Sequence, residues 1–274
     1  MGYKQCLHTH STFCDGKSTL EEMVLSAIEK KFDSIGFSGH SYMDIYSEFS
    51  MSEEKVVAYK QEIARLQQIY GDKIKIYCGL EKDNYTNLST DGYDYLIGSV
   101  HAVRYGQELL FIDWTADRTR EQIRDIFGGD GLAYAKAYFQ AVADLPKYGS
   151  FDILGHFDLL TKFNEQEPDL FDADCPEYRA AATAAAEALV GKVKYFEVNT
   201  GAISRGYRTT PYPAPFIIKE MKRLGFGAII SSDCHDANFL DCAYEEAKKL
   251  LKDAGYTEHY VLKEEGFVAI PLED

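Results

Sequence analysis

Short runs rich in β-branched and aromatic residues alternate with longer amphipathic stretches along almost the whole chain. Each short run can form one strand, and the stretches between them have the apolar spacing of helices. This alternation is typical of a parallel sheet with helices packed outside it. We therefore predict an α/β fold of about seven strand-helix units. A closed barrel and an open doubly wound sheet both satisfy the pattern.

The same pattern gives approximate boundaries. The strands are predicted at residues 3–7, 34–38, 73–80, 93–100, 151–155, 194–199 and 226–232, with a last one at 259–262. Helices are predicted at 18–32, 52–71, 176–191, 213–225 and 241–255, and two more within 117–148, divided by "GGDG" at 128–131. A capping box from Ser18 to Glu21 opens the first helix, and Gly71 ends the second.

The length of the chain suits one barrel. With 274 residues, 46% of them hydrophobic, it can bury a large core without a second domain, and no linker or repeat interrupts it. We predict a single domain over residues 1–274. No GxGxxG follows the first strand, which disfavours a dinucleotide-binding sheet, and "GGDG" lacks the lysine of a P-loop.

The composition limits the partners. A net charge of -15 makes nucleic acid an unexpected partner, because binding many phosphates needs clustered Lys and Arg. No apolar run approaches the roughly 20 residues that span a bilayer, so no membrane role is expected. The six cysteines contain no CxxC pair, and the N-terminus does not resemble a signal peptide, so we expect a cytoplasmic protein with reduced thiols.

Histidines concentrate at the ends of predicted strands. Six of the seven lie there, and only His259 lies elsewhere; the six are His8, His10, His40, His101, His156 and His235. Parallel strands point their carboxyl ends to one face, where α/β folds gather their reactive groups. Any one of these histidines could be an ordinary buried or surface residue, but together they predict a built site.

Carboxylates follow the same strands. Asp15 follows the first histidine pair, Glu81 ends its strand, and Asp233 lies two residues before a histidine. Asp15 and Asp233 could instead be helix N-caps. For Glu197, which lies inside a predicted strand, ligation and support of a ligand are both open.

Spacing explains the opening stretch "LHTHSTFCDG". Alternate side chains of an extended segment face the same way, so His8 and His10 can grip one ion, as can Asp233 and His235. Six imidazoles and three carboxylates exceed the ligands of one ion, so we predict two or three metals. Mixed imidazole and carboxylate ligands suit Zn, Mn or Fe.

These motifs resemble the PHP (polymerase and histidinol phosphatase) superfamily, and most closely its histidinol-phosphate phosphatases. The resemblance covers nearly the whole chain through "HTHS" with Asp15, "FSGHS", "GLE", "GSVH", "GHFD", "EVNTG" and "SSDCH". It implies a PHP fold, a distorted seven-stranded (β/α)7 TIM-like barrel, with a three-metal centre on its C-terminal rim.

The resemblance also implies which residues share each ion. One ion would be held by His8, His10, Glu81 and Asp233. Glu81 would bridge to a second, held by His101 and His156, and a third would take Asp15, His40 and His235.

Substrate contacts follow from the same resemblance. Arg205 matches a phosphate-binding arginine of the family's phosphatases. At "HFDLLTKF" the chain departs from its relatives, which tend to carry an arginine where Thr161 stands, and Lys162 is the candidate substitute. Arg104 is a further candidate to orient the phosphate, with a solvated loop charge as its alternative.

The sequence thus predicts a metal-dependent hydrolase acting on a small phosphorylated substrate. In this hypothesis a metal-bridging hydroxide attacks the phosphorus of histidinol phosphate, a step of histidine biosynthesis, with Asp15, Glu81, Asp233 and Arg205 as catalytic residues. Asp158 and Asp113 are candidates to protonate the leaving alkoxide. The alternatives are another phosphomonoester, a nucleotide or a phosphodiester as substrate, or a non-catalytic module that the metals stabilise.

Overall fold

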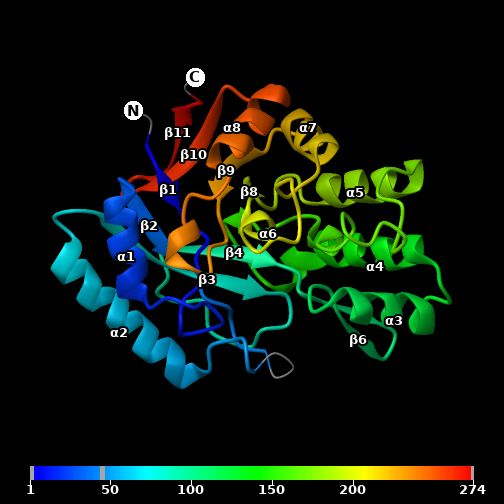
Figure 1. The fold of residues 1–274 in the computed structure, drawn as a ribbon, viewed down its shortest axis with the longest axis horizontal. Coiled ribbons are helices and arrows are strands. Elements are labelled where there is room, and N and C mark those ends of the chain that lie inside the picture. The colour runs from blue at the N-terminus through cyan, green and yellow to red at the C-terminus, as the bar shows by residue number, and fades with distance from the viewer. Residues whose placement is uncertain (1–2, 44–46, 273–274) are drawn as a thin grey trace.

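The computed structural model describes residues 3–43 and 47–272. Its main sheet has seven parallel strands in the order β1-β2-β3-β4-β7-β8-β9. Figure 1 shows this sheet at the centre of the molecule, with helices around it. The strands are β1 (Gln5–Cys6), β2 (Ser34–Phe37), β3 (Lys75–Asp83), β4 (Tyr95–Ser99), β7 (Ile153–Leu154), β8 (Tyr195–Asn199) and β9 (Gly227–Ser231).

The sheet is nearly closed into a barrel. Just beyond the ends of β1 and β9, Thr9 and Cys234 form a parallel bridge. There the amide of His10 donates to the carbonyl of Cys234 at 2.8 Å, and the amide of Cys234 donates to the carbonyl of His8 at 3.2 Å. The predicted barrel is therefore confirmed, and the open sheet is excluded. The barrel closes next to His8 and His10, so closure brings the first predicted ligands along the chain close to the last ones, Asp233 and His235.

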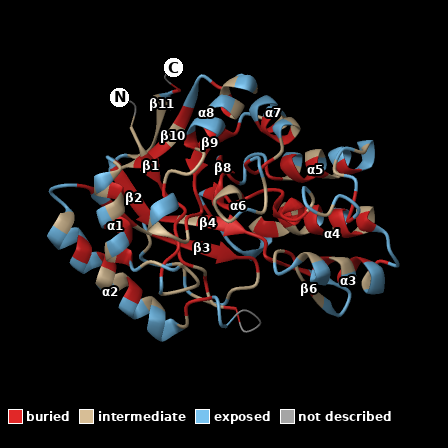
Figure 2. Ribbon diagram, viewed as in Figure 1, coloured by how far each residue is buried: buried red, intermediate tan, exposed pale blue. Residues whose placement is uncertain are grey.

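The helices cover the outside of this barrel, and the predicted ones are all present. They are α1 (Leu20–Glu29), α2 (Glu53–Tyr70), α3 (Ala116–Ile126), α4 (Gly131–Asp144), α5 (Pro176–Ala188), α6 (Gly201–Ser204), α7 (Pro215–Arg223) and α8 (Tyr244–Asp253). Their outer faces are exposed and the strands between them are buried (Figure 2). The capping box of α1 lies one residue later than predicted, between Thr19 and Glu22.

Two hairpins were not predicted in full. β5 (Ala102–Tyr105) pairs with β6 (Glu108–Phe111), and β10 (Glu258–Lys263), predicted at 259–262, pairs with β11 (Gly266–Pro271). The second hairpin covers the N-terminal mouth of the barrel. There the side chain of Gln5 donates to the carbonyl of Leu262 at 2.8 Å and accepts from its amide at 2.7 Å.

The barrel interior is filled by one cluster of large side chains. Its members are Leu7, Tyr77, Tyr95, Ile97, Ile153, Tyr195, Ile229 and Leu262. The ring of Tyr95 fits because Gly36 and Gly79 leave space for it: a Cβ on Gly79 would lie only 2.2 Å from the ring. With the centre packed and one mouth covered, the open rim is the face where the strands end.

No helix in the described ranges is long and apolar enough to cross a bilayer.

Candidate metal centre

The nine predicted ligands meet at the carboxyl ends of the strands. They come from the loops after β1, β2, β4, β7 and β9 and from β3 itself. Their atoms form four overlapping groups, within each of which the potential ligand atoms lie within 4.8 Å of one another. Side chains up to 225 positions apart, such as those of His10 and His235, are thus neighbours, as the predicted topology requires.

The first ligand set surrounds one point between β1 and β9. His8 Nε2 lies 3.4 Å from Glu81 Oε2 and 3.6 Å from Asp233 Oδ1. His10 Nε2 lies 3.5 Å and 3.3 Å from the same two oxygens. Metal bonds of about 2.1 Å at near-tetrahedral angles separate ligand atoms by about 3.4 Å. These four spacings therefore suit a shared ion.

Glu81 joins this set to a second. Its Oε1 lies 3.0 Å from His156 Nε2 and 3.5 Å from His101 Nε2, while its Oε2 faces the first set and also His40 Nδ1, at 2.8 Å. A carboxylate with each oxygen turned to different imidazoles can bridge two ions. The residues thus stand as the predicted bridge requires.

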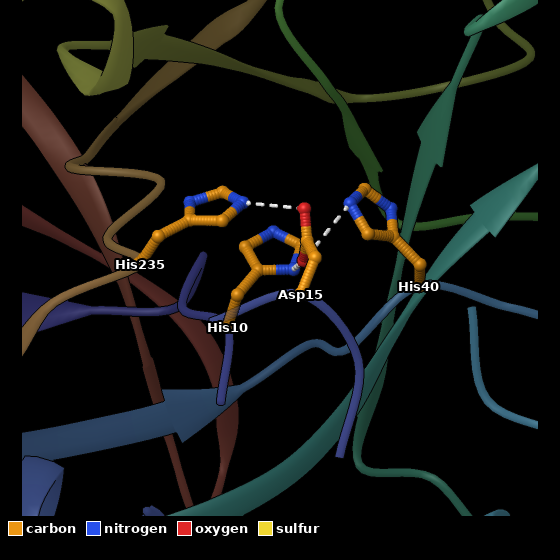
Figure 3. Close-up of side chains that lie close together, drawn as sticks. All are labelled: His10, Asp15, His40 and His235. Atoms are coloured by element: carbon orange, nitrogen blue, oxygen red, sulfur yellow. Dashed lines mark hydrogen bonds and ion pairs between the residues drawn. The ribbon is translucent and has the colours of Figure 1, made fainter. Parts of the chain in front are cut away.

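Asp15, His10, His40 and His235 form the third group, drawn in Figure 3. Asp15 Oδ2 lies 3.2 Å from His235 Nε2, and Asp15 Oδ1 lies 3.6 Å from His40 Nε2. The side chains of Asp15, His40 and His235 are 24%, 20% and 14% exposed, whereas those of His8 and His10 are fully buried. This third position therefore opens to the rim.

Several of these atoms are buried without a hydrogen-bond partner. Among the described residues, His8 Nε2, His10 Nε2, Asp15 Oδ1 and Glu81 Oε2 are in this state. Buried polar atoms are normally satisfied, and four orphans that converge on each other would be costly in a structural core. Divalent cations would satisfy all four, so the donor set fits a divalent-metal centre.

The charges of the centre depend on one another. Burial disfavours the imidazolium of His101, but Glu81 and Asp83 outweigh it and raise its pKa to about 9. Burial opposes ionisation of Glu81 as well, yet His8, His40 and His101 hold its pKa well below the usual range. Burial, with His235 and His40, lowers the pKa of His10 to about 3. The carboxylates therefore remain anionic and ready to bind cations.

The helix-cap alternative for the two aspartates is wrong. Thr19 caps α1, and Ala243 precedes α8, so neither Asp15 nor Asp233 caps a helix. Asp233 instead has a φ of 45° and turns its carboxylate to the histidines of the first set.

A cavity of about 210 Å³ opens beside the centre. Asp15, His40 and His101 form one wall. The remaining lining comes from Ser41, Met43, Phe49, Ser50, Asp83, Asp113, Trp114 and Lys162. Structural metal sites are closed by protein ligands, whereas catalytic ones keep open positions, so a cavity against three ligands favours catalysis.

The sequence-family model of the PHP domain matches residues 7–201, which is more than half of the chain. The chain belongs to the PHP domain family. Two named relatives are similar over most of their length. A Schizosaccharomyces pombe protein named "Probable histidinol-phosphatase" is 27% identical over 91% of this chain and 86% of its own length. The Bacillus subtilis histidinol-phosphatase is 26% identical over 87% of this chain and 96% of its own.

A solved structure resembles this PHP fold along almost the whole chain. Histidinol phosphate phosphatase from Lactococcus lactis, crystallised with Zn, L-histidinol and phosphate, superposes with a TM-score of 0.72 at 24% identity. The match covers 97% of this chain and 98% of the other. It supports the PHP barrel independently of the strand pairing described above.

The predicted phosphate contacts differ in their positions around this PHP centre. Arg205, at the end of α6, donates to Asp233 Oδ2 at 3.1 Å and lies 2.8 Å from His235 Nδ1. Lys162 lines the cavity and donates to the carbonyl of Asp113 at 2.8 Å. Arg104 is exposed on β5, stacks on Tyr85 at 5.5 Å and does not line the cavity.

The two candidate acids do not suit that role. Burial opposes ionisation of Asp113, but Lys162 and His101 lower its pKa, so it is anionic near neutral pH. Asp158 is fully buried, its Oδ2 accepts from the amide of Ala214 at 2.9 Å, and it lines a different cavity. Asp113 lines the 210 Å³ cavity but holds no proton to donate near neutral pH, and Asp158 does not line this cavity.

An arginine does occupy the neighbourhood of Thr161, where the sequence departs from its relatives. Arg208 donates to both the carbonyl and the hydroxyl of Thr161, and its guanidinium stacks on Tyr212 at 4.7 Å. Its side chain is only 8% exposed and lines the second cavity, beside Asp158. The positive charge near Thr161 therefore comes from the loop after α6 as well as from Lys162.

Sequence reasoning missed three residues around the PHP centre. Asp83 Oδ2 lies 2.7 Å from His101 Nδ1, Asn199 donates to Glu197, and Trp114 lines the cavity while 53% exposed. Asp83 and Asn199 each lie two positions beyond a motif residue on the same strand, so alternation along the strand could have indicated both.

Proposed function

We propose that this chain is a metal-dependent phosphomonoesterase that hydrolyses L-histidinol phosphate to L-histidinol and phosphate. The observation that carries this is the cavity of about 210 Å³, whose lining combines the proposed ligands Asp15, His40 and His101 with Asp113 and Trp114. The relatives named histidinol-phosphatase, and the Lactococcus lactis structure with Zn, L-histidinol and phosphate, support the choice of substrate.

Two or three divalent transition metals, Zn, Mn or Fe, complete the proposed site. The first ion would be held by His8, His10, Glu81 and Asp233, the second by Glu81, His101 and His156, and the third by Asp15, His40 and His235. When bound, such ions supply Lewis acidity toward phosphoryl oxygens and lower the pKa of water.

Arg205 is the proposed phosphate clamp. Asp233 and His235 hold its guanidinium at the rim of the third ligand group, and its side chain remains 26% exposed. A guanidinium can bind two oxygens of a phosphate at once, which an ammonium cannot. Arg205 would therefore orient the phosphoryl group and compensate its charge as the P–O bond breaks.

Lys162 is proposed to act from the lining of the cavity. Its ammonium donates to the carbonyl of Asp113 and lies 3.5 Å from Asp113 Oδ2. The same Nζ makes a cation–π contact with Tyr207, 4.7 Å from the centre of the ring. With its side chain only 9% exposed, this cation is fixed in position. It would contribute a positive field to the cavity more than a direct bidentate contact.

The remaining wall suits the alcohol half of histidinol phosphate. Met43, Phe49 and Trp114 give an apolar, aromatic surface on which an imidazole ring can stack. Asp113 is anionic and faces the same cavity, so it can pair with the ammonium group of the substrate. An acidic and aromatic lining favours this alcohol over a nucleotide or a simple diester, which has no ammonium group to pair with Asp113.

The test compares turnover across substrates. Metal-loaded protein should hydrolyse histidinol phosphate with a kcat/KM at least about tenfold above those for p-nitrophenyl phosphate, glycerol 2-phosphate and bis-p-nitrophenyl phosphate. His10→Ala should abolish turnover, because it removes a ligand of the first set. His259→Ala is the matched control, since His259 lies on β10, away from the centre.

Two results would count against the proposal. Selectivity below tenfold would remove histidinol phosphate as the preferred substrate and leave a phosphoesterase of broader range. Absence of turnover by fully metal-loaded protein on all four esters would favour the metal-stabilised module. The single domain over residues 1–274 and the cytoplasmic location stay predictions.

A further inference from the structure

β8 is the exception among the barrel strands. Every other strand of the seven, or the loop that follows it, contributes at least one of the nine proposed metal ligands. β8 contributes none, yet two of its residues, Glu197 and Asn199, are polar and fully buried. They lie on the same side of the strand as Tyr195, which belongs to the barrel interior. Their position therefore needs an explanation other than ligation.

Glu197 contacts two ligands at once. Its two oxygens lie 3.1 and 2.9 Å from His8 Nδ1, and Oε1 also accepts from the backbone amide of His156 at 2.8 Å. A carboxylate only accepts hydrogen bonds, so the proton of His8 must reside on Nδ1. The lone pair on His8 Nε2 is then directed at the first ligand set, toward Glu81 and Asp233.

Asn199 extends the contact to a third ligand. The amide of Gly201 donates to Asn199 Oδ1 at 2.9 Å, which fixes the orientation of the side-chain amide. Its Nδ2 then donates to Glu197 Oε1 at 2.8 Å and to Asp233 Oδ2 at 3.3 Å. Ligands that follow β1, β7 and β9 are thus joined through the one strand that lacks a ligand.

We propose that Glu197 is a positioning residue of the metal centre. It fixes the tautomer of His8 for coordination through Nε2 and, with Asn199, holds His8, His156 and Asp233 in register. This inference rests on the metal sites of the proposed function and adds to them a residue that does not touch metal or substrate. It makes no claim about the substrate.

Glu197→Gln tests the proposal without changing size. Three donors face the carboxylate of Glu197, from His8, His156 and Asn199. An amide has one oxygen, so in either orientation its NH2 group meets at least one of these donors. Toward His8, the NH2 group would drive the proton to Nε2 and block coordination. We expect zinc affinity, measured by competition with a fluorescent chelator, to fall about 10- to 100-fold.

Asp83→Asn is the matched control. Asp83 Oδ2 lies 2.7 Å from His101 Nδ1, but Asp83 Oδ1 has no hydrogen-bond partner. An asparagine can therefore keep its oxygen toward His101 and place its NH2 group in the unpartnered position. We expect this variant to lose less zinc affinity than Glu197→Gln. Equal losses in the two variants would overturn the proposal, as would unchanged affinity in Glu197→Gln.

The ¹⁵N spectrum of the histidines gives a readout that general destabilisation would not mimic. In the zinc-loaded native protein, His8 should carry its proton on Nδ1 and coordinate through Nε2; a proton on Nε2 would overturn the proposal even if Glu197→Gln fails to fold. These zinc-binding and tautomer results can be distinguished from a failure of the proposed phosphatase function. Zinc binding needs no turnover, so a native protein that binds zinc but hydrolyses no ester would contradict the phosphatase alone.

Discussion

Replacing Glu81 with glutamine should disturb the centre more than any other isosteric change. Glu81 is 1% exposed, and its oxygens lie between 2.8 and 3.5 Å from nitrogens of five imidazoles: His8, His10, His40, His101 and His156. At 3.5 Å and an effective dielectric constant of 20, one unit-charge pair is worth about 5 kcal/mol, or about 3.5 pKa units as a ceiling.

His101 reports this loss in the metal-free protein. Its pKa is raised to about 9 against the effect of burial, with Glu81 the largest contributor and Asp83 the next. Asp83 stays in Glu81→Gln, so we expect the pKa of His101 to fall by about one to three units rather than to collapse. An NMR titration of the imidazole in chelator-treated protein measures the change.

Metal binding gives the second readout for the same variant. A neutral amide is a poor bridge between two cations, so zinc affinity should fall more than about 100-fold, beyond the 10- to 100-fold typical of outer contacts. Asp94→Asn is the control. Asp94 is exposed and lies immediately before β4, so this variant should bind zinc normally. A pKa of His101 that stays near 9, or zinc affinity within tenfold of native, would refute the assignment of Glu81 as the bridge.

Three further outcomes follow from the same structure. Because the pKa of His101 in the folded protein is raised to about 9, its contribution to stability is complete below about pH 6.5 and is lost toward pH 9. The Tm of metal-free protein should therefore fall over this pH range, whereas the Tm of zinc-loaded protein should not show this fall. Identical plots of Tm against pH for the two forms would contradict the prediction. Arg205→Lys should lower kcat/KM at least about tenfold, whereas Arg104→Ala should change it less than about twofold, because only Arg205 contacts the centre; equal losses would show that the phosphate binds elsewhere. Gly79→Ala should lower the free energy of unfolding by about 1–3 kcal/mol in a denaturant titration, because its Cβ would lie 2.2 Å from the ring of Tyr95; native stability would mean that the ring is not held there.

The clustering of the strand-end histidines could be predicted, because the carboxyl ends of parallel strands all lie on one face of the sheet. The closed barrel could not be predicted from periodicity alone, since an open sheet has the same local pattern. Closure depends on the pairing of Thr9 with Cys234, which lie far apart along the chain. The capping box was misplaced by one residue because Ser18 with Glu21 and Thr19 with Glu22 both fit the motif, and only the backbone path decides between them.

The hairpin of β5 and β6 has a sequence signal in its turn, which hydrophobic periodicity does not detect. Two residues, Gly106 and Gln107, connect its strands, and Gly106 has a φ of 62°, which favours glycine in such turns. This hairpin returns the chain to the centre, where the amide of Ile112 donates to the carbonyl of His101 at 3.0 Å. It thereby places Asp113 and Trp114 at the cavity, so missing the hairpin also hides part of the proposed substrate-binding surface.

The role of Glu197 could not be decided from sequence for a different reason. A buried glutamate inside a strand can bind a metal, hold a ligand or pair with a cation, and the choice depends on which atoms face it. Its partner His8 lies 189 positions away along the chain. Only the fold brings the two together.

Anomalous diffraction from crystals grown with zinc would locate the ions of the proposed metal centre. We expect at least two zinc peaks at the carboxyl ends of the strands, within bonding distance of His8, His10, Glu81 and Asp233 and of His101 and His156. Zinc bound only at surface carboxylates, with His8 Nε2 and Glu81 Oε2 still buried and unligated, would contradict this expectation.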